Sequence, residues 1–242
     1  MRYGIFSDIH SNLEALDAVI RAYQEESIDQ YLCVGDVVGY GSNPNECVEK
    51  VKQLAAVTVA GNHDWASVGI FSDDYFNPYA KDAVHWTRDN LSNASSDFLG
   101  QLKLFHENKD LTLVHGTLEG AENFDYMIDS YTARSTFRIL HTDICFVGHL
   151  HICGVFAQDK DGYIGYGEPN TVELKDKHKY IVNTGSVGQP RDGNPDAAYC
   201  IYDTDKKEVR IKRVKYDIEA ARKKIIQAGI PVKLGDRLLV GR

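Results

Sequence analysis

Several features that mark other classes of protein are missing from this 242-residue sequence. No apolar run is long enough to span a bilayer, and the first residues contain no apolar stretch typical of a secretory signal. Lys and Arg form no cluster or stripe, and the net charge is -8. We therefore expect a cytoplasmic protein that binds neither membranes nor duplex nucleic acid.

Cysteine is scarce, and no Cys-x-x-Cys pair is present. Three of the five cysteines, Cys33, Cys145 and Cys200, lie in apolar, strand-like runs. This pattern predicts buried free thiols in a reducing compartment. The sequence also contains no linker rich in Ser, Gly or Pro and no internal repeat. We therefore expect one domain over residues 1–242. The sequence leaves homo-oligomerisation open.

The first sixty residues alternate between strand and helix patterns. Short apolar runs predict three strands, at residues 3–7, 30–34 and 55–60. The helix between the first two begins at a capping box, from Ser11 to Glu14, and the next begins at Asn43 with Pro44 in its first turn. This order predicts a parallel sheet with helical crossovers.

The remaining residues suggest a second sheet. Residues 65–107 are helix-like and aromatic, which predicts helices packed on the sheet edge or, as the alternative, a partial lid. Further strands are expected at 110–114 and 143–147, whose exits join the edge of the first sheet. Shorter strands follow at 153–157, 180–183, 198–202 and 208–214, and these four are expected to form the second sheet. Helices are expected at 130–140 and 217–228. The fold class is therefore α/β, with a largely parallel sheet packed against a largely antiparallel one and helices on the flanks.

Metal-ligand side chains follow five of the predicted strands. They are Asp8 with His10, Asp36, Asn62, His115, and His149 with His151. Because parallel strands end at one edge of a sheet, we expect these groups to converge. Where the spacing is i, i+2, an extended backbone would turn both side chains the same way. Seven candidate ligands exceed the needs of one tetrahedral ion and suit two adjacent ions with a bridging carboxylate.

Taken together, these motifs resemble those of a known family. The set is Asp8-x-His10, Gly35-Asp36, Gly61-Asn62-His63-Asp64, His115 and Gly148-His149-x-His151. It is similar to the motif set of the calcineurin-like metallophosphoesterases, and most similar to the compact prokaryotic YfcE-type phosphodiesterases. The resemblance implies a four-layer α-β-β-α fold.

The resemblance also implies a role for each residue. One ion would be held by Asp8, His10 and His151, the other by Asn62, His115 and His149, with Asp36 bridging the two. His63 would be a catalytic residue that contacts the substrate, and Asp64 would orient its ring. Asn62 and His63 are thus candidate substrate contacts, and Arg191 either joins them or is a solvated surface residue.

The chemistry of such a site favours phosphoester hydrolysis. Two divalent ions can each bind a phosphate oxygen and activate a hydroxide for attack. Nitrogen and oxygen ligands without a thiolate favour Mn, Fe, Ni, Co or Zn. We expect a small phosphodiester or phosphomonoester substrate, with the diester favoured.

Two alternatives are less well supported by the sequence. A protein or dinucleotide phosphatase of the family would carry an Arg in the Gly-Asp motif, and residues 35–41 contain none. A non-catalytic protein-binding scaffold on the same fold would have lost His63 or several ligands, and this chain retains all of them.

Overall fold

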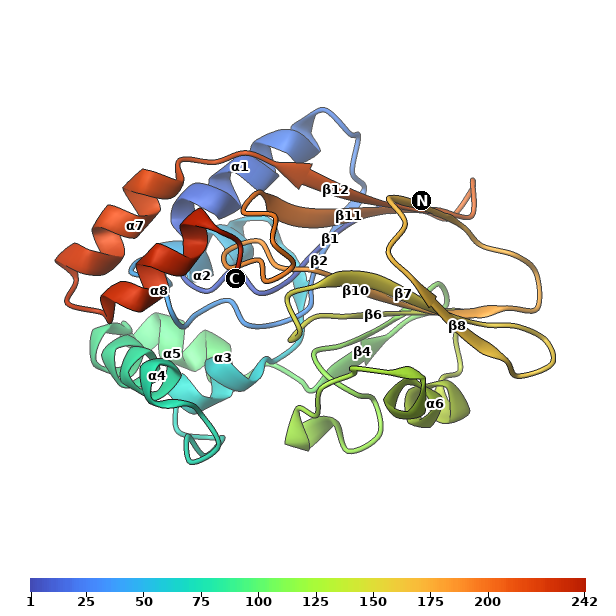
Figure 1. Cartoon of the computed structure of the whole chain (residues 1–242), viewed down its shortest axis with the longest axis horizontal. Coiled ribbons are helices and arrows are strands. Elements are labelled where there is room, and N and C mark those ends of the chain that lie inside the picture. Colours follow the sequence, from blue (N-terminus) through green and yellow to red (C-terminus); the bar gives the residue numbers. More distant parts are fainter.

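The computed structural model describes all residues, 1–242, and its strands form two six-stranded sheets that pack face to face (Figure 1). The first sheet has the order β3 (Val57–Thr58), β2 (Gln30–Cys33), β1 (Arg2–Phe6), β11 (Ala197–Asp203), β12 (Glu208–Val214) and β9 (Thr171–Glu173). The second has the order β4 (Phe105–Glu107), β5 (Thr112–Val114), β6 (Ile144–Val147), β10 (Lys179–Thr184), β7 (Cys153–Gln158) and β8 (Ile164–Gly167).

Both sheets are mixed. Strands β1, β2 and β3 pair in parallel, as do β5, β6 and β10, and every other neighbouring pair is antiparallel. The predicted α/β fold with two packed sheets is confirmed, but the first sheet is not largely parallel, because each sheet has two parallel and three antiparallel pairs. The assignment of strands to sheets was wrong in two places: β11 and β12 belong to the first sheet, where Cys200 pairs with Ile5, and β5 and β6 belong to the second.

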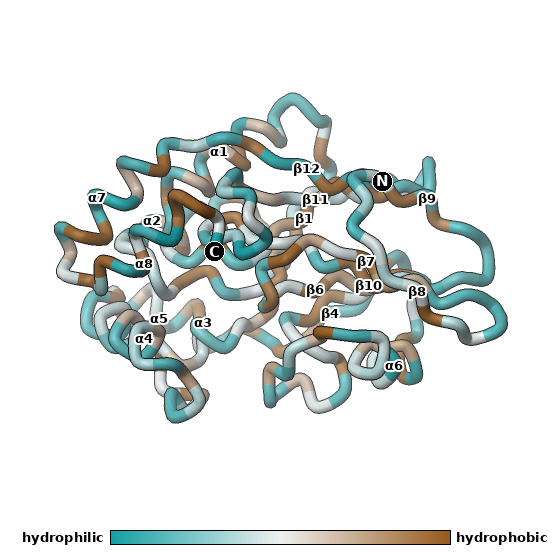
Figure 2. The backbone as a smooth tube through the Cα atoms, in the orientation of Figure 1, coloured by the Kyte–Doolittle hydropathy of each residue, from teal (hydrophilic) through white to brown (hydrophobic).

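The main core lies between the two sheets. Ile5 and Leu32 of the first sheet and Phe146 and Val182 of the second are fully buried in one cluster. Figure 2 shows the corresponding hydrophobic tracts along the strands, with hydrophilic residues on the outer loops. The five cysteines form no disulfide, as predicted, and four of them are buried.

Helices cover the outer face of each sheet and complete four layers. Helix α1 (Leu13–Gln24) and α2 (Pro44–Gln53) pack on β1, β2 and β11. Helix α6 (Ser130–Ile139) packs on β6, β7 and β10 (Figure 1). The cap of α1 is Asn12, whose side chain accepts from the Ala15 amide, and not the predicted Ser11.

A third group of helices lies beside the sheet edge. It contains α3 (Asn62–Ser67), α4 (Pro78–Asn90), α5 (Asn93–Gly100), α7 (Ile218–Gln227), α8 (Val232–Asp236) and a last 3₁₀ turn (Arg237–Leu239). Residues 65–107 are thus largely helical, as predicted. Helices α4, α7 and α8 share a small apolar core that includes Tyr40. No helix of the chain combines the length and the apolar character needed to cross a membrane.

Candidate functional site

The loops that follow β1, β2, β5 and β6, together with the start of α3, meet at one place. They carry all seven predicted metal ligands, and each of these side chains is buried: Asp8, His10, Asp36, Asn62, His115, His149 and His151. The predicted convergence at strand ends is therefore correct. The ends come from both sheets, however, and not from one parallel sheet.

The backbone at these positions is not extended. Asp8, His10, Asp36, His149 and His151 all have a positive φ, between 50° and 66°. The extended backbone that would turn both members of each i, i+2 pair the same way is therefore not present, because all four residues are left-handed. A left-handed conformation costs a non-glycine residue about 1–2 kcal/mol, and such strain is concentrated at functional sites.

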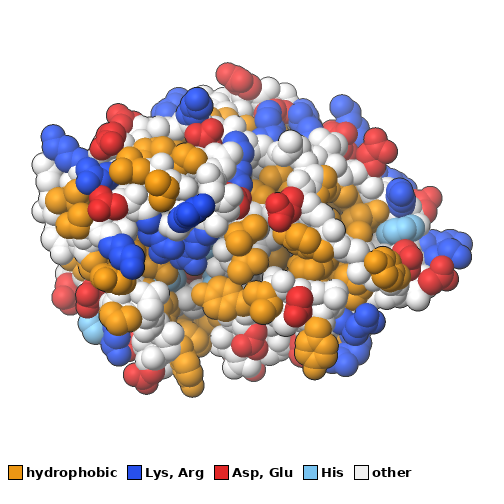
Figure 3. Space-filling model, in the orientation of Figure 1, with side chains coloured by type: hydrophobic (Ala, Val, Ile, Leu, Met, Phe, Trp, Pro, Cys, Tyr) orange, Lys and Arg blue, Asp and Glu red, His pale blue; other side chains and the backbone are white.

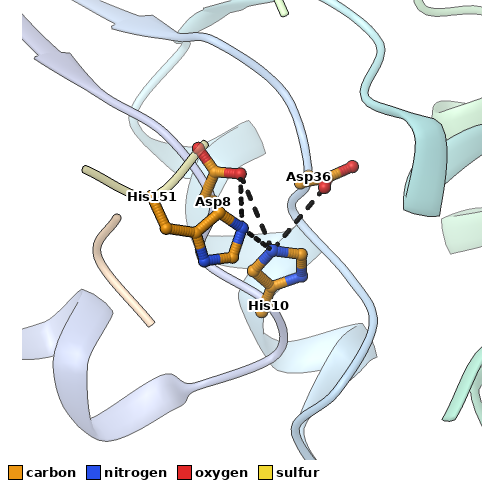
Figure 4. A group of neighbouring side chains, drawn as sticks. All are labelled: Asp8, His10, Asp36 and His151. Atoms are coloured by element: carbon orange, nitrogen blue, oxygen red, sulfur yellow. Dashed lines mark hydrogen bonds and ion pairs between the residues drawn. The ribbon is translucent and has the colours of Figure 1, made fainter. Parts of the chain in front are cut away.

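The ligand atoms form two groups that share one carboxylate. In the first group, Asp8, His10, Asp36 and His151 bring one ligand atom each to within 4.8 Å of one another (Figure 4). The second group consists of Asp36, His115 and His149, whose ligand atoms also lie within 4.8 Å of one another. Each group could hold a metal ion, and Asp36 belongs to both.

Backbone carbonyls fix the orientation of three imidazole rings. Nδ1 of His10 donates to the Val38 carbonyl (3.1 Å), Nδ1 of His115 to that of Val34 (2.7 Å), and Nδ1 of His151 to that of Gln189 (2.6 Å). Because a carbonyl oxygen can only accept, Nδ1 carries the proton in each ring. Nε2 of the neutral ring is then a free ligand atom that faces the centre, the usual arrangement for a metal-binding histidine.

The arrangement fits a cation between these side chains. Nε2 of His10 and Nε2 of His151 lie 3.0 Å apart, and when both rings are neutral and protonated at Nδ1 each of these atoms presents a lone pair to the other. Three further buried atoms make no hydrogen bond, Asp36 Oδ2, Asn62 Oδ1 and His115 Nε2, and the first and last of them lie 3.3 Å apart. Buried polar atoms normally find partners, and a divalent ion bound by nitrogen and oxygen ligands would satisfy all five.

Burial and mutual attraction shift the pKa values of these groups. Burial opposes ionisation of Asp8, but the nearby imidazoles of His151 and His10 hold its pKa well below the usual range. Likewise, burial disfavours the charged form of His115, yet the Asp36 carboxylate raises the pKa of His115 to about 9. Burial, aided by His115, lowers the pKa of His149 to about 3. The site therefore concentrates carboxylate charge that a metal cation can neutralise.

The His63 ring lies at the edge of this centre. It packs against the rings of His10 (centroids 4.9 Å apart), Tyr40 (4.4 Å) and Phe76 (4.7 Å). Its Nδ1 is buried and has no hydrogen-bond partner. The prediction that Asp64 orients this ring is therefore wrong.

Asp64 binds the backbone instead. Its Oδ1 accepts from the Val38 amide at 3.1 Å, and its Oδ2 accepts from the Gly61 amide at 3.0 Å. Both oxygens are thus used to join the loop after β2 to the start of α3. Burial, followed by the charge of Asp36, raises the pKa of Asp64 to about 7.

Gly61 is required by close packing at Asp36. A Cβ atom at this position would lie 2.0 Å from Asp36 Oδ1, far inside contact distance. The same oxygen accepts from the His63 amide at 2.9 Å. The absence of a side chain at Gly61 therefore lets α3 begin directly against the shared carboxylate.

A cavity of about 460 Å³ opens beside the ligands. Arg191 lines it, so this residue is not a solvated surface arginine. Its Nη2 donates to Gln189 Oε1 (3.0 Å), its Nε is buried without a partner, and its guanidinium lies over the Tyr40 ring at 5.6 Å. Phosphate binding by Arg191 stays a prediction.

The sequence did not reveal the aromatic wall of this cavity. The wall contains Phe71, Phe76, Phe124 and Tyr126. The aromatic content of residues 65–107 gave a signal for the first two, as the lid alternative. Phe124 and Tyr126 lie in an irregular loop without a recognisable pattern, and only the structure brings them to the site.

Comparison with known proteins agrees with this geometry. Residues 1–207 match the sequence profile described as the calcineurin-like phosphoesterase superfamily domain. An uncharacterised protein of Methanocaldococcus jannaschii is 40% identical over 243 residues, which cover 99% of this chain and 98% of that protein.

Two crystal structures share the fold over the whole chain. A metallophosphoesterase from Sphaerobacter thermophilus is 37% identical with a TM-score of 0.89, and the match covers 100% of this chain and 99% of the other. A hypothetical protein from Pyrococcus horikoshii is 19% identical with a TM-score of 0.79, and the match covers 100% and 98% of the two chains.

Proposed function

We propose that this chain, which belongs to the calcineurin-like phosphoesterase superfamily, hydrolyses small phosphodiesters, and phosphomonoesters less efficiently, with two divalent metal ions. The observation that carries the proposal is the pair of buried ligand groups that share Asp36. We assign Asp8, His10 and His151 to one ion. We further assign the group of Asn62, His115 and His149 to the other, since Asn62 Oδ1 is buried and unpartnered.

The charge of the site supports an anionic substrate. When bound, two divalent ions would supply the positive charge that attracts phosphate oxygens and that acidifies a water molecule. The carboxylates of Asp8 and Asp36 offset about half of that charge, so the loaded pocket is cationic although the chain has a net charge of -8. Candidate metals are Mn, Fe, Ni, Co and Zn, given the nitrogen and oxygen ligands.

Two further side chains would act on the substrate. Arg191 reaches into the cavity with an unpartnered Nε and suits a phosphate oxygen. His63 lines the same cavity, and we assign it the protonation of the leaving oxygen. Proton transfer of this kind contributes about 10²–10⁴-fold to a rate.

We also infer that residues 1–242 act as one domain. Helices α7 and α8 lie beyond the matched residues 1–207, yet they share an apolar core with α4 and with Tyr40, which lines the cavity. The C-terminal helices therefore support one wall of the site.

Hydrolysis is favoured over a non-catalytic scaffold role. A scaffold has no need for free ligand atoms, and unpartnered buried polar groups cost about 1–3 kcal/mol each. This site keeps three buried atoms without a hydrogen bond, on Asp36, Asn62 and His115, of which the Asp36 and His115 atoms lie 3.3 Å apart.

A screen of metals against substrates tests the proposal. Metal-free protein would be loaded in turn with Mn, Fe, Ni, Co or Zn and assayed with bis-p-nitrophenyl phosphate and p-nitrophenyl phosphate. We expect turnover with at least one metal and a higher kcat/KM for the diester. Absence of hydrolysis with every metal would overturn the proposal and favour the scaffold.

A pair of variants tests the shared carboxylate. Because Asp36 belongs to both groups and His10 to one, Asp36→Asn should lower metal content more than His10→Ala does, as measured by elemental analysis. Equal, full metal content in the two variants would contradict a bridging position.

A further inference from the structure

The cavity beside the ligands is larger and more aromatic than a phosphate group requires. Its volume of about 460 Å³ falls in the range of pockets that enclose whole organic ligands. Among the aromatic rings that line it, four come from two separate segments of the chain: Phe71 and Phe76 from one, and Phe124 and Tyr126 from the other. Hydrophobic side chains also border the hollow in the middle of the face in Figure 3. The substrate should therefore carry an apolar, planar group.

We propose that this aromatic wall binds a nucleobase, so that the phosphodiester cleaved at the site is a nucleotide. The inference rests on the proposed function for the position of the phosphate. The wall itself supplies the evidence for the base.

Tyr126 offers a flat surface for stacking. Its ring lies parallel to the His149 ring, with centroids 3.9 Å apart and planes 17° apart. Nevertheless, Tyr126 is 50% exposed, so the other face of the ring is open. An aromatic ring that is packed on one face and exposed on the other can stack against a planar base.

Phe71 and Phe124 pack against each other in the same cavity wall as Tyr126. Phe71 and Phe124 meet edge to face with centroids 5.1 Å apart. Phe124 has a φ of 54°, a conformation that bulky residues rarely adopt outside functional segments. This strained residue directs the loop so that Tyr126, two positions later, reaches His149.

Polar groups at the same cavity suit the edge of a base. Asn77, Asn123 and Asp125 line it, and all three are exposed, although Asn77 Oδ1 already accepts from the Ala80 amide at 3.1 Å. Amide and carboxylate side chains are common partners for the donors and acceptors of bases. Arg191 lines the cavity together with the ligand residues, and the phosphate belongs near it. The cavity thus combines a phosphate end with an aromatic, amide-bearing end.

A binding experiment tests the base directly. The manganese-loaded protein would be titrated calorimetrically with thymidine 5′-monophosphate and with 2-deoxyribose 5-phosphate, which lacks only the base. We expect about tenfold tighter binding of the nucleotide, in keeping with the usual strength of stacking on an aromatic side chain. Equal affinities would overturn the inference.

Three variants locate the effect. Tyr126→Leu and Phe71→Leu keep apolar volume but remove a ring, and each should bring the ratio of the two affinities to about two or less. Because both ligands share the sugar phosphate, any effect on the metal cancels in this ratio. Tyr131→Leu, on α6 at a residue 81% exposed, is the matched control and should keep the tenfold ratio. A ratio unchanged in Tyr126→Leu and Phe71→Leu would also overturn the inference.

Hydrolysis assays separate this inference from the proposed function. The substrates would be a thymidine joined by a 3′,5′-phosphodiester to an abasic residue, and the same dimer with both residues abasic. We expect a KM about tenfold lower for the thymidine dimer. Turnover of bis-p-nitrophenyl phosphate without any preference for the base would refute the inference alone. Preferred binding of the nucleotide without turnover of any ester would refute the proposed function alone.

Discussion

Asp64 provides a sharp test of how the loops of the site are held together. Its two carboxylate oxygens accept from the amides of Val38 and Gly61, and the side chain is fully buried. Replacement by Ala removes both acceptors, whereas replacement by Asn keeps one and places an amide donor against the other N–H group.

The expected loss of stability follows from the number of unpaired amides. Each buried N–H group left without an acceptor costs about 1–3 kcal/mol. Asp64→Ala should therefore destabilise the protein by about 4 kcal/mol and Asp64→Asn by about 2 kcal/mol. For a chain of this length, these values correspond to a fall in melting temperature of about 8–16 °C and about 4–8 °C.

Thermal unfolding followed by circular dichroism measures this loss. Asp82→Asn, at an exposed position on α4, is the matched control and should stay within about 0.5 kcal/mol of the wild type. The folded fraction of Asp64→Asn should retain its turnover per bound metal. A variant that melts with the wild type but has lost its turnover would refute the backbone role and restore Asp64 as the partner of His63.

Three other outcomes are expected. His63→Ala should keep the metal content of the wild type by elemental analysis and lose about 100-fold in turnover. His85→Ala, at an exposed position, is the control and should change neither quantity. Loss of metal in His63→Ala would contradict a substrate-facing role. Gly61→Ala places a methyl group 2.0 Å from Asp36 Oδ1 and should reduce the metal content. Gly100→Ala is the control and should keep it, because the nearest atom to its methyl group would lie 3.9 Å away. Equal metal content in Gly61→Ala and the wild type would show that the loop adapts. Chelation should lower the melting temperature of the wild type, and added metal should restore it. The reason is that Nε2 of His10 and Nε2 of His151 lie 3.0 Å apart and face each other when no ion separates them. An unchanged melting temperature would count against a resident ion.

The ligand set could be predicted from sequence because its signal is local. Each group follows an apolar run, as Asp8 follows β1 and Asp36 follows β2, and the end of a strand is easy to recognise. The α/β fold with two sheets could be predicted for a related reason: the alternation of strand and helix patterns is visible along the chain, and the family resemblance implied the four layers. Both predictions depend on short stretches of sequence.

Pairing between distant strands could not be predicted in the same way. An alternating pattern identifies β11 as a strand but does not say that its partner is β1, almost 200 positions earlier. The placement of β11 and β12 therefore failed, although their existence was recognised. Partner choice depends on packing of the whole sheet, which single-strand patterns do not contain.

The backbone conformation and side-chain contacts of the site also could not be predicted from the sequence. Spacing alone suggested an extended backbone at Asp8 and His10, yet both residues are left-handed. The family resemblance suggested that Asp64 serves His63, yet the partners of Asp64 include an amide 26 positions away. Side-chain-to-backbone bonds and strained turns are set by tertiary structure, which overrides local expectation.

Two buried ligand groups that share Asp36 are proposed to hold one divalent ion each. Crystals of the manganese-loaded protein, measured for anomalous scattering, reveal the number and position of bound ions. We expect two anomalous peaks, one among Asp8, His10 and His151 and one among Asn62, His115 and His149, with Asp36 in contact with both. A single peak, or peaks only at other positions, would rule out this arrangement.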